Sequence, residues 1–164
     1  MPSATQRARP APAMDIVVES PLWRDAPNAA AVLRRAIGEA AEVTDATGAR
    51  ELAIMLCDDA AMRELNARWR GRPEPTNVLS FPAAGEAVTL GDIAIAYETT
   101  AREAEAEGKP FADHLAHLAV HGFLHLLGYD HQSDAEAAAM ERLETAILER
   151  LGVPDPYAQD GTPT

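Results

Sequence analysis

Runs of apolar residues along the chain predict four β-strands. The first alternates and is rich in β-branched residues, and the others are short apolar runs bounded by polar residues, proline or glycine. The predicted strands are Met14–Glu19, Arg50–Cys57, Asn77–Phe81 and Leu90–Tyr97. Because Pro82 lacks a backbone N–H, we expect it to stop the third strand, and a loop around Gly85 leads into the fourth.

Apolar residues three or four positions apart predict helices between and after these strands. The predicted helices are Pro27–Val43, Asp59–Trp69, Glu98–Glu107, Pro110–Leu127 and Asp134–Leu151. Asp58 suits the N-cap of the second helix, and Gly128 suits the turn after the fourth. The segment 71–76, GRPEPT, contains two prolines and is predicted to be a loop.

Together these elements predict an α/β (α+β) fold with one compact domain. A small mixed four-stranded sheet would pack with about four to five helices in the order β-α-β-α-β-β-α-α. The length of 164 residues suits a single domain. We expect the domain to span 14–153, after a disordered lead over 1–13 and before a flexible tail over 154–164.

Composition narrows the functional classes. The formal net charge of −12 argues against indiscriminate binding of polyanions, so a nucleic-acid partner would need a local basic patch. No stretch approaches about 18 consecutive apolar residues, so no membrane span is expected. The single cysteine, Cys57, lies in an apolar run and is interpreted as a core residue. One free thiol suits a reducing compartment, and we expect a cytoplasmic protein.

All five histidines fall between positions 114 and 131, and the last three form the run HGFLHLLGYDH. His121 and His125 are four residues apart, so their rings lie on one face of the predicted helix. Gly128 can reverse the chain and return His131 as a third ligand. Three imidazoles leave the fourth tetrahedral position of one Zn²⁺ open for water, which the ion would convert to a hydroxide nucleophile. Imidazole also suits nickel and copper.

Three other residues near this run have two interpretations each. His114 and His117 extend the same stripe, either as partners of the ligands or as polar residues at the helix edge. Asp130 either orients a ligand imidazole or is an ordinary turn residue.

The spacing H-x3-H-x2-G-x2-H equals that of the metzincin proteases, which carry glutamate after the first histidine. Here Gly122 occupies that position, and glycine cannot serve as a general base. A metalloprotease is therefore disfavoured.

Another group must stabilise charge, and four arginines lie between positions 63 and 72, at Arg63, Arg68, Arg70 and Arg72. A guanidinium suits phosphate oxygens, whereas a solvated helix end is the better interpretation of Arg63 and Arg68.

With these residues in view, the sequence resembles the YbeY endoribonuclease family of bacterial rRNA maturation factors. Two blocks carry the resemblance. The first is LNARWRGRPEPTNVLSFP, Leu65–Pro82, followed by LGDIAIA, Leu90–Ala96. The second is HGFLHLLGYDH, His121–His131. The resemblance covers roughly 14–152 and leaves only the two ends of the chain outside it.

The resemblance implies a zinc-dependent endoribonuclease specific for single-stranded RNA, with one Zn²⁺ on His121, His125 and His131. The family's functional arginine falls on Arg70, which would stabilise the phosphate during attack by zinc-bound hydroxide. This chain has Trp69 where the family usually has tyrosine or phenylalanine, which keeps a stacking surface, and Arg72-Pro73 where Lys-Asp is common. Further candidates for contact with the ligands or the substrate are His117, Asp130, Trp69 and Ser80.

The implied role is maturation of the 16S rRNA 3′ end and ribosome quality control. The expected partners are single-stranded RNA, the 16S rRNA precursor and the ribosome or its small-subunit proteins, with no DNA and no membrane. Two alternatives compete with this hypothesis. One is a ribosome-assembly factor that acts by binding partners and uses the metal only for folding, and the other is a metalloprotease.

Overall fold

The structure, a computed structural model, describes residues 12–46, 50–72, 74–84 and 88–156. Its centre is a four-stranded sheet in the order β1-β2-β4-β3. The strands are β1 (Ala13–Val18), β2 (Glu51–Cys57), β3 (Val78–Pro82) and β4 (Thr89–Ala96). β1, β2 and β4 are parallel, and β3 pairs with β4 in the antiparallel sense at the edge of the sheet.

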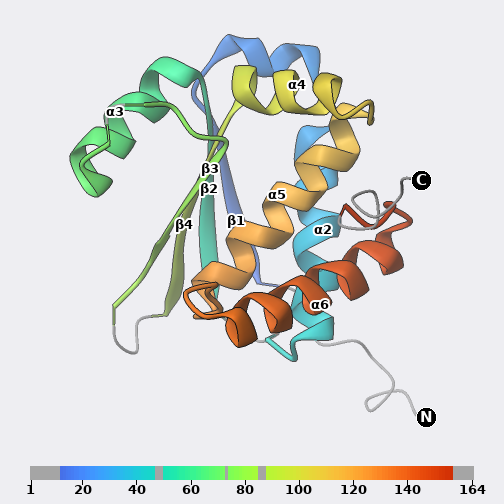
Figure 1. Ribbon diagram of the computed structural model, residues 1–164. Coiled ribbons are helices and arrows are strands. Elements are labelled where there is room, and N and C mark those ends of the chain that lie inside the picture. The colour runs from blue at the N-terminus through green and yellow to red at the C-terminus, as the bar shows by residue number, and fades with distance from the viewer. Residues whose placement is uncertain (1–11, 47–49, 73, 85–87, 157–164) are drawn as a thin grey trace.

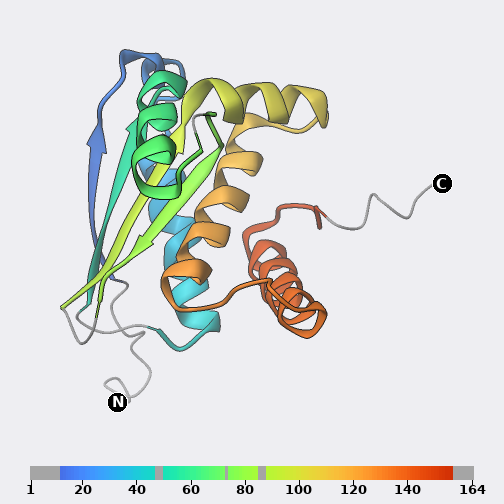
Figure 2. The same ribbon diagram turned by 60° about the vertical axis from the view of Figure 1, so that its left-hand side comes forward.

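Five α-helices and one short 3₁₀ helix surround the sheet in the described part of the chain. They are η1 (Pro21–Asp25), α2 (Ala29–Val43), α3 (Asp59–Arg70), α4 (Tyr97–Ala106), α5 (Phe111–Leu126) and α6 (Asp134–Leu151). Helices α2 and α5 lie side by side against one face of the sheet, and α6 packs outside them (Figure 1). Figure 2 shows α3 on the opposite side of the sheet. The result is a layered domain with α5 near its centre.

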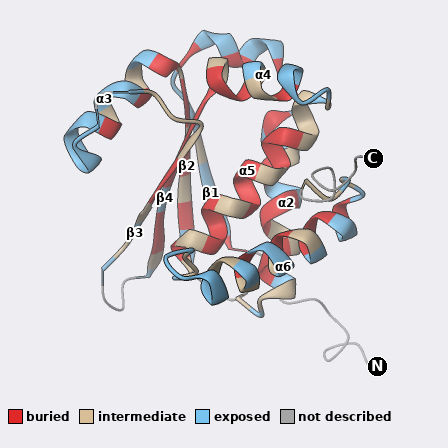
Figure 3. Ribbon diagram, in the orientation of Figure 1, coloured by how far each residue is buried: buried red, intermediate tan, exposed pale blue. Residues whose placement is uncertain are grey.

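The main core lies between the sheet and the helices α2 and α5. Leu33 and Ile37 of α2, Ile54 and Ile93 of the sheet and Phe123 of α5 are each at most 1% exposed. Figure 3 shows burial along most of α5, whereas the outer side of α6 is exposed. Because α5 is held on several sides, side chains that leave it have defined positions.

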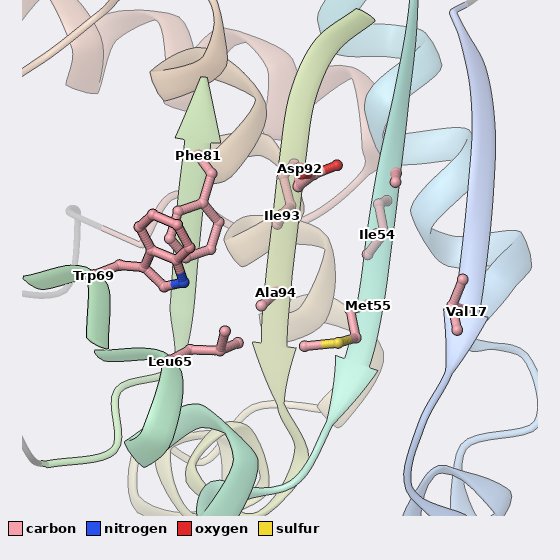
Figure 4. A pocket seen from close by; sticks show the side chains of 10 residues that line it. Val17, Ile54, Met55, Leu65, Trp69, Phe81, Asp92, Ile93 and Ala94 are labelled. Atoms are coloured by element: carbon pink, nitrogen blue, oxygen red, sulfur yellow. The ribbon is translucent and has the colours of Figure 1, made fainter. Parts of the chain in front are cut away.

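Among the described residues, α3 covers the other face of the sheet at one end (Figure 1). Beside α3 lies a hollow of about 420 Å³, and we call it the apolar hollow. Its lining includes Val17, Met55, Leu65, Trp69 and Phe81, with Asp92 at its edge (Figure 4). Trp69 is 61% exposed, and its ring centroid lies 6.2 Å from that of Phe81.

The predicted fold class is confirmed, and three α-helices follow the last strand, close to the three predicted ranges, although the predicted element order counted only two of them. The expectation that Pro82 stops β3 was wrong by one residue, because Pro82 is the last residue of β3 and pairs with Gly91. A strand at a sheet edge tolerates a residue without an N–H. The η1 helix was not predicted. Residues 1–11 and 157–164, most of the two predicted termini, lie outside the described residues, as does Gly85, and the predicted domain bounds stay a prediction.

The structure bears on two expectations drawn from composition, the burial of Cys57 and the lack of a membrane span. Cys57 is fully buried, and this burial, reinforced by Asp58, raises the pKa of its thiol to about 12. Among the described helices, none is long and apolar enough to cross a membrane.

Candidate metal centre

Helix α5 holds the first two histidines of the motif. It begins after Pro110, whose extended conformation directs the chain into the helix, and it runs to Leu126. The four-residue spacing places the rings of His121 and His125 one turn apart, with centroids 4.6 Å from each other. Their Nε2 atoms face each other at 3.1 Å. Two nitrogens of one tetrahedral zinc site lie about 3.3 Å apart, so this distance suits ligands that share an ion.

A glycine turn brings the third histidine back to the helix. Gly128 has φ of +101°, a backbone conformation that side chains rarely adopt. The backbone N–H groups of Gly128 and Tyr129 donate to carbonyl oxygens of His125 and Leu124 at 3.0 Å each, which closes the end of α5. The chain then reverses, and the ring centroid of His131 lies 5.2 Å from that of His125.

The three rings thus surround a common point. One nitrogen from each of His121, His125 and His131 lies within 4.8 Å of the other two. The donor set is three neutral nitrogens, which suits zinc and other borderline divalent ions. Among the described residues these three could hold a metal ion, as the spacing predicted. A set of three ligands leaves room at an ion for water or substrate.

The surroundings favour the uncharged form of His125. Burial lowers the pKa of this imidazole, and the proximity of His121 and His131 lowers it further. A hydrogen bond to the backbone of Tyr129 and the charge of Asp130 oppose the effect without reversing it. Since a metal binds imidazole through a free lone pair, the fold favours the form of this candidate ligand that binding requires.

The histidines lie in a second hollow, of about 430 Å³, which we call the histidine hollow. Arg70, Ser80 and Asp130 line it together with the three rings. Arg70 is the last residue of α3, and Gly71 then ends the helix in the left-handed conformation with φ of +70°. The Arg70 guanidinium Nη2 donates to the carbonyl oxygen of Ser80 at 3.0 Å. The one arginine singled out by the resemblance is therefore at the rim of the predicted metal centre.

Ser80 has a structural contact in this hollow. Its side chain is buried, and its Oγ donates to the carbonyl oxygen of Gly122 at 3.0 Å. A Cβ atom at Gly122 would come within 3.2 Å of both Ser80 Oγ and Ile93 Cγ2. The position that carries glutamate in metzincins therefore faces the sheet, and glycine there lets α5 lie close to β3 and β4.

Glu144, which the sequence analysis did not single out, contacts one of the candidate ligands from α6. Glu144 of α6 is 1% exposed, and its Oε2 lies 2.6 Å from Nδ1 of His121. Its other oxygen, Oε1, lies 3.1 Å from Nε2 of His117. The signal was present in the sequence, because Glu144 interrupts the apolar face of α6 between Met140 and Ile147.

The remaining candidates take separate places. Asp130 accepts the backbone N–H of His131 at 2.8 Å, as a turn residue does, and its carboxylate lies 3.7 Å from that ring's Nδ1. Trp69 lines the apolar hollow, on the other side of β3 from the histidines. His114 is buried and lies 2.8 Å from a carboxylate oxygen of Glu103, away from the ligands.

The fold and the three histidines define a class of protein, an α/β domain with a candidate metal centre. A family model described as endoribonuclease YbeY matches residues 22–152. The chain is 58% identical over 156 residues to endoribonuclease YbeY of Rhodopseudomonas palustris strain BisA53, which covers 90% of this chain and 91% of the relative. It is 57% identical over 159 residues to the same enzyme of Bradyrhizobium sp. strain BTAi1, covering 91% and 94% of the two chains.

The chain therefore belongs to the endoribonuclease YbeY family. This confirms the predicted family and the predicted class of enzyme, a hydrolase that acts on phosphodiester bonds. The solution structure of TM1509 from Thermotoga maritima shares the fold, with a TM-score of 0.57 and 23% identity over 91% of this chain and 99% of that one.

Proposed function

We propose that this protein is a zinc-dependent endoribonuclease that cleaves single-stranded RNA in the histidine hollow. The observation that carries the proposal is the convergence of His121, His125 and His131 on one point, with Arg70 at the rim of the same hollow. The name of the relatives, endoribonuclease, supports RNA as the substrate class. We propose Zn²⁺ as the ion because three imidazoles form a common zinc donor set.

The residues of the chain divide the work. The three histidines would hold the ion, which supplies a Lewis acid and activates water for attack on phosphorus. Arg70 is exposed and always charged, and its planar fork can donate to phosphate oxygens while one N–H remains on Ser80. Its positive charge stabilises the extra negative charge that develops as the phosphodiester is attacked.

We further propose that the cellular substrate is the precursor of 16S rRNA, whose 3′ end the enzyme would mature, and that it takes part in ribosome quality control. The net charge of −12 supports a substrate bound locally rather than by a general attraction to polyanions. Cytoplasmic ribosomes and their small-subunit proteins are the corresponding partners. Accumulation of unprocessed 16S rRNA in cells whose only copy is Arg70→Ala is the expected phenotype.

A cleavage assay tests the activity. The purified zinc-loaded protein is incubated with an unstructured RNA, the same RNA annealed to its complement, and a casein substrate. We expect cleavage of the unstructured RNA alone. His125→Ala should reduce cleavage to the level of buffer, because two remaining imidazoles hold the ion poorly. Equal cleavage by His125→Ala would reveal a contaminating nuclease, and casein cleavage would favour a protease.

The assembly-factor alternative is separated by a cell-based experiment. Arg63 of α3 is exposed like Arg70, but it does not line the histidine hollow, so Arg63→Ala is the matched control. We expect Arg63→Ala to restore normal ribosomes in cells that lack the protein, and Arg70→Ala to fail. Full function of an Arg70→Ala protein that still binds zinc would support the assembly factor.

A further inference from the structure

The charged group most deeply buried beside the metal centre is a carboxylate from another helix. Glu144 of α6 is 1% exposed, although it belongs to a helix whose other buried residues are Met140, Ile147, Leu148 and Leu151. A carboxylate on an apolar helix face costs free energy unless it is hydrogen-bonded or paired. A residue retained there at such a cost needs a compensating interaction.

Both oxygens of Glu144 meet histidine rings of α5. Oε2 lies 2.6 Å from His121 Nδ1, and Oε1 lies 3.1 Å from His117 Nε2. An ionised carboxylate only accepts hydrogen bonds, so each facing ring nitrogen must carry a proton. For His121 this leaves Nε2 as the nitrogen with the free lone pair. That is the atom that faces Nε2 of His125 at 3.1 Å.

We propose that Glu144 is a positioning residue that fixes His121 as the Nδ1–H tautomer and aims its Nε2 at the metal. His117 holds the other carboxylate oxygen, so Glu144 cannot rotate away from His121. The proposal rests on the proposed function only in assigning a metal to the three histidines. Carboxylates that accept from the outer N–H of a metal-bound histidine orient the ring and make it a better donor.

The arrangement also links the last helix to the metal centre. Helix α6 packs against both α2 and α5, and Glu144 is its contact with the ligand His121. Because the carboxylate and the ring meet only when α6 is packed in place, metal affinity depends on the folding of the C-terminal helix.

The experiment compares Glu144→Gln with Glu141→Gln, an exposed glutamate on the same helix that serves as the matched control. Zinc affinity is measured by competition with a chromophoric chelator, using folded full-length protein. We expect Glu144→Gln to weaken zinc binding by about 10- to 100-fold, the usual loss for such a partner. Glu141→Gln should match wild type. His117→Gln should show a smaller loss, because it acts through Glu144.

The tautomer of His121 can be measured without bound metal and without any substitution. In the metal-free wild-type protein, long-range ¹H–¹⁵N spectra of the histidine rings should show His121 protonated at Nδ1. An Nε2-protonated ring would overturn the proposal, as would unchanged zinc affinity in Glu144→Gln accompanied by a lower unfolding temperature, the pattern of a purely structural role. If the wild-type protein bound no zinc, the proposed function would fail, and the tautomer measurement would still decide the role of Glu144.

Discussion

The two hollows beside strand β3 are almost equal in volume, about 430 Å³ and 420 Å³, and opposite in chemistry. Consecutive strand residues point to opposite faces, so Ser80 meets α5 in the histidine hollow while Phe81 packs beside Trp69 in the apolar hollow. Likewise Trp69 and Arg70 are neighbours in the chain and line different hollows. Residues of one sequence block therefore do not all belong to one site.

The hollows also differ in what supports them. The apolar hollow needs only the side chains that alternate along the sheet and a helix over one end of it. The histidine hollow depends on a specific glycine turn, a close approach of α5 at Gly122 and a buried carboxylate from α6. Side chains that share one metal ion must be held in fixed directions, and these three features hold the candidate ligands in place.

The largest expected effect is a difference in kcat between substitutions at the neighbouring residues Arg70 and Trp69. Arg70→Ala should lower kcat for RNA cleavage by about 100-fold, because a charge that stabilises the attacked phosphate is lost. Trp69→Ala should change kcat less than about threefold, as expected for a surface substitution away from the chemistry. Steady-state kinetics on an unstructured RNA provide both values. A similar large loss in both variants would mean that the substrate spans the two hollows.

A smaller effect is expected from two glycines with positive φ. Gly128→Ala and Gly108→Ala should each destabilise the protein by about 1–3 kcal/mol, because alanine is strained at φ of +101° and +67°. Of these two glycines, only Gly128 forms the turn that returns His131, so only Gly128→Ala should also weaken zinc binding. The loss of affinity should reach about tenfold if the turn relaxes in the metal-free variant and binding must impose about 1.4 kcal/mol of strain again. Urea unfolding and chelator competition measure the two quantities. Equal zinc affinities would show that the turn tolerates alanine.

The smallest effect concerns the side of the sheet away from the histidines. Cys57 packs with Met62 and Leu79, and its pKa is about 12, against an ordinary value of 9.0. The folded protein therefore resists ionisation of the thiol, and its stability should fall as pH rises above 9. At pH 10 the wild type should lose about 1.4 kcal/mol more than Cys57→Ala, relative to pH 8. If urea unfolding showed the same loss of stability in the two proteins between pH 8 and pH 10, the raised pKa of the Cys57 thiol would be refuted.

Much of the fold could be predicted because apolar residues recur along the sequence with the spacing typical of strands or of helices. The short η1 helix and the inclusion of Pro82 in β3 were not predicted. The five residues of η1 are too few to show a hydrophobic period, and Pro82 is tolerated in β3 because β3 is an edge strand. The three histidines were predictable because two share one helix face and a glycine returns the third.

Contacts between distant segments were harder to predict. Glu144 is 23 residues from His121, and only the packing of α6 on α5 brings the two together. Trp69 was proposed as a stacking surface for RNA bases, and contact with substrate stays a prediction. The sequence did not indicate that Trp69 lines a different hollow from Arg70, because the direction of a side chain at a helix end depends on what packs beneath it. Phe81, on the outer face of β3, is that partner here.

The most direct test of the central claim is a crystal structure of the zinc-loaded protein with anomalous data at the zinc absorption edge. We predict one ion, with Nε2 of His121, Nε2 of His125 and a ring nitrogen of His131 at about 2.0–2.1 Å, and a fourth position held by no protein atom. An ion bound elsewhere, or a fourth protein ligand that closes the coordination sphere, would contradict the assignment of this hollow as a catalytic centre.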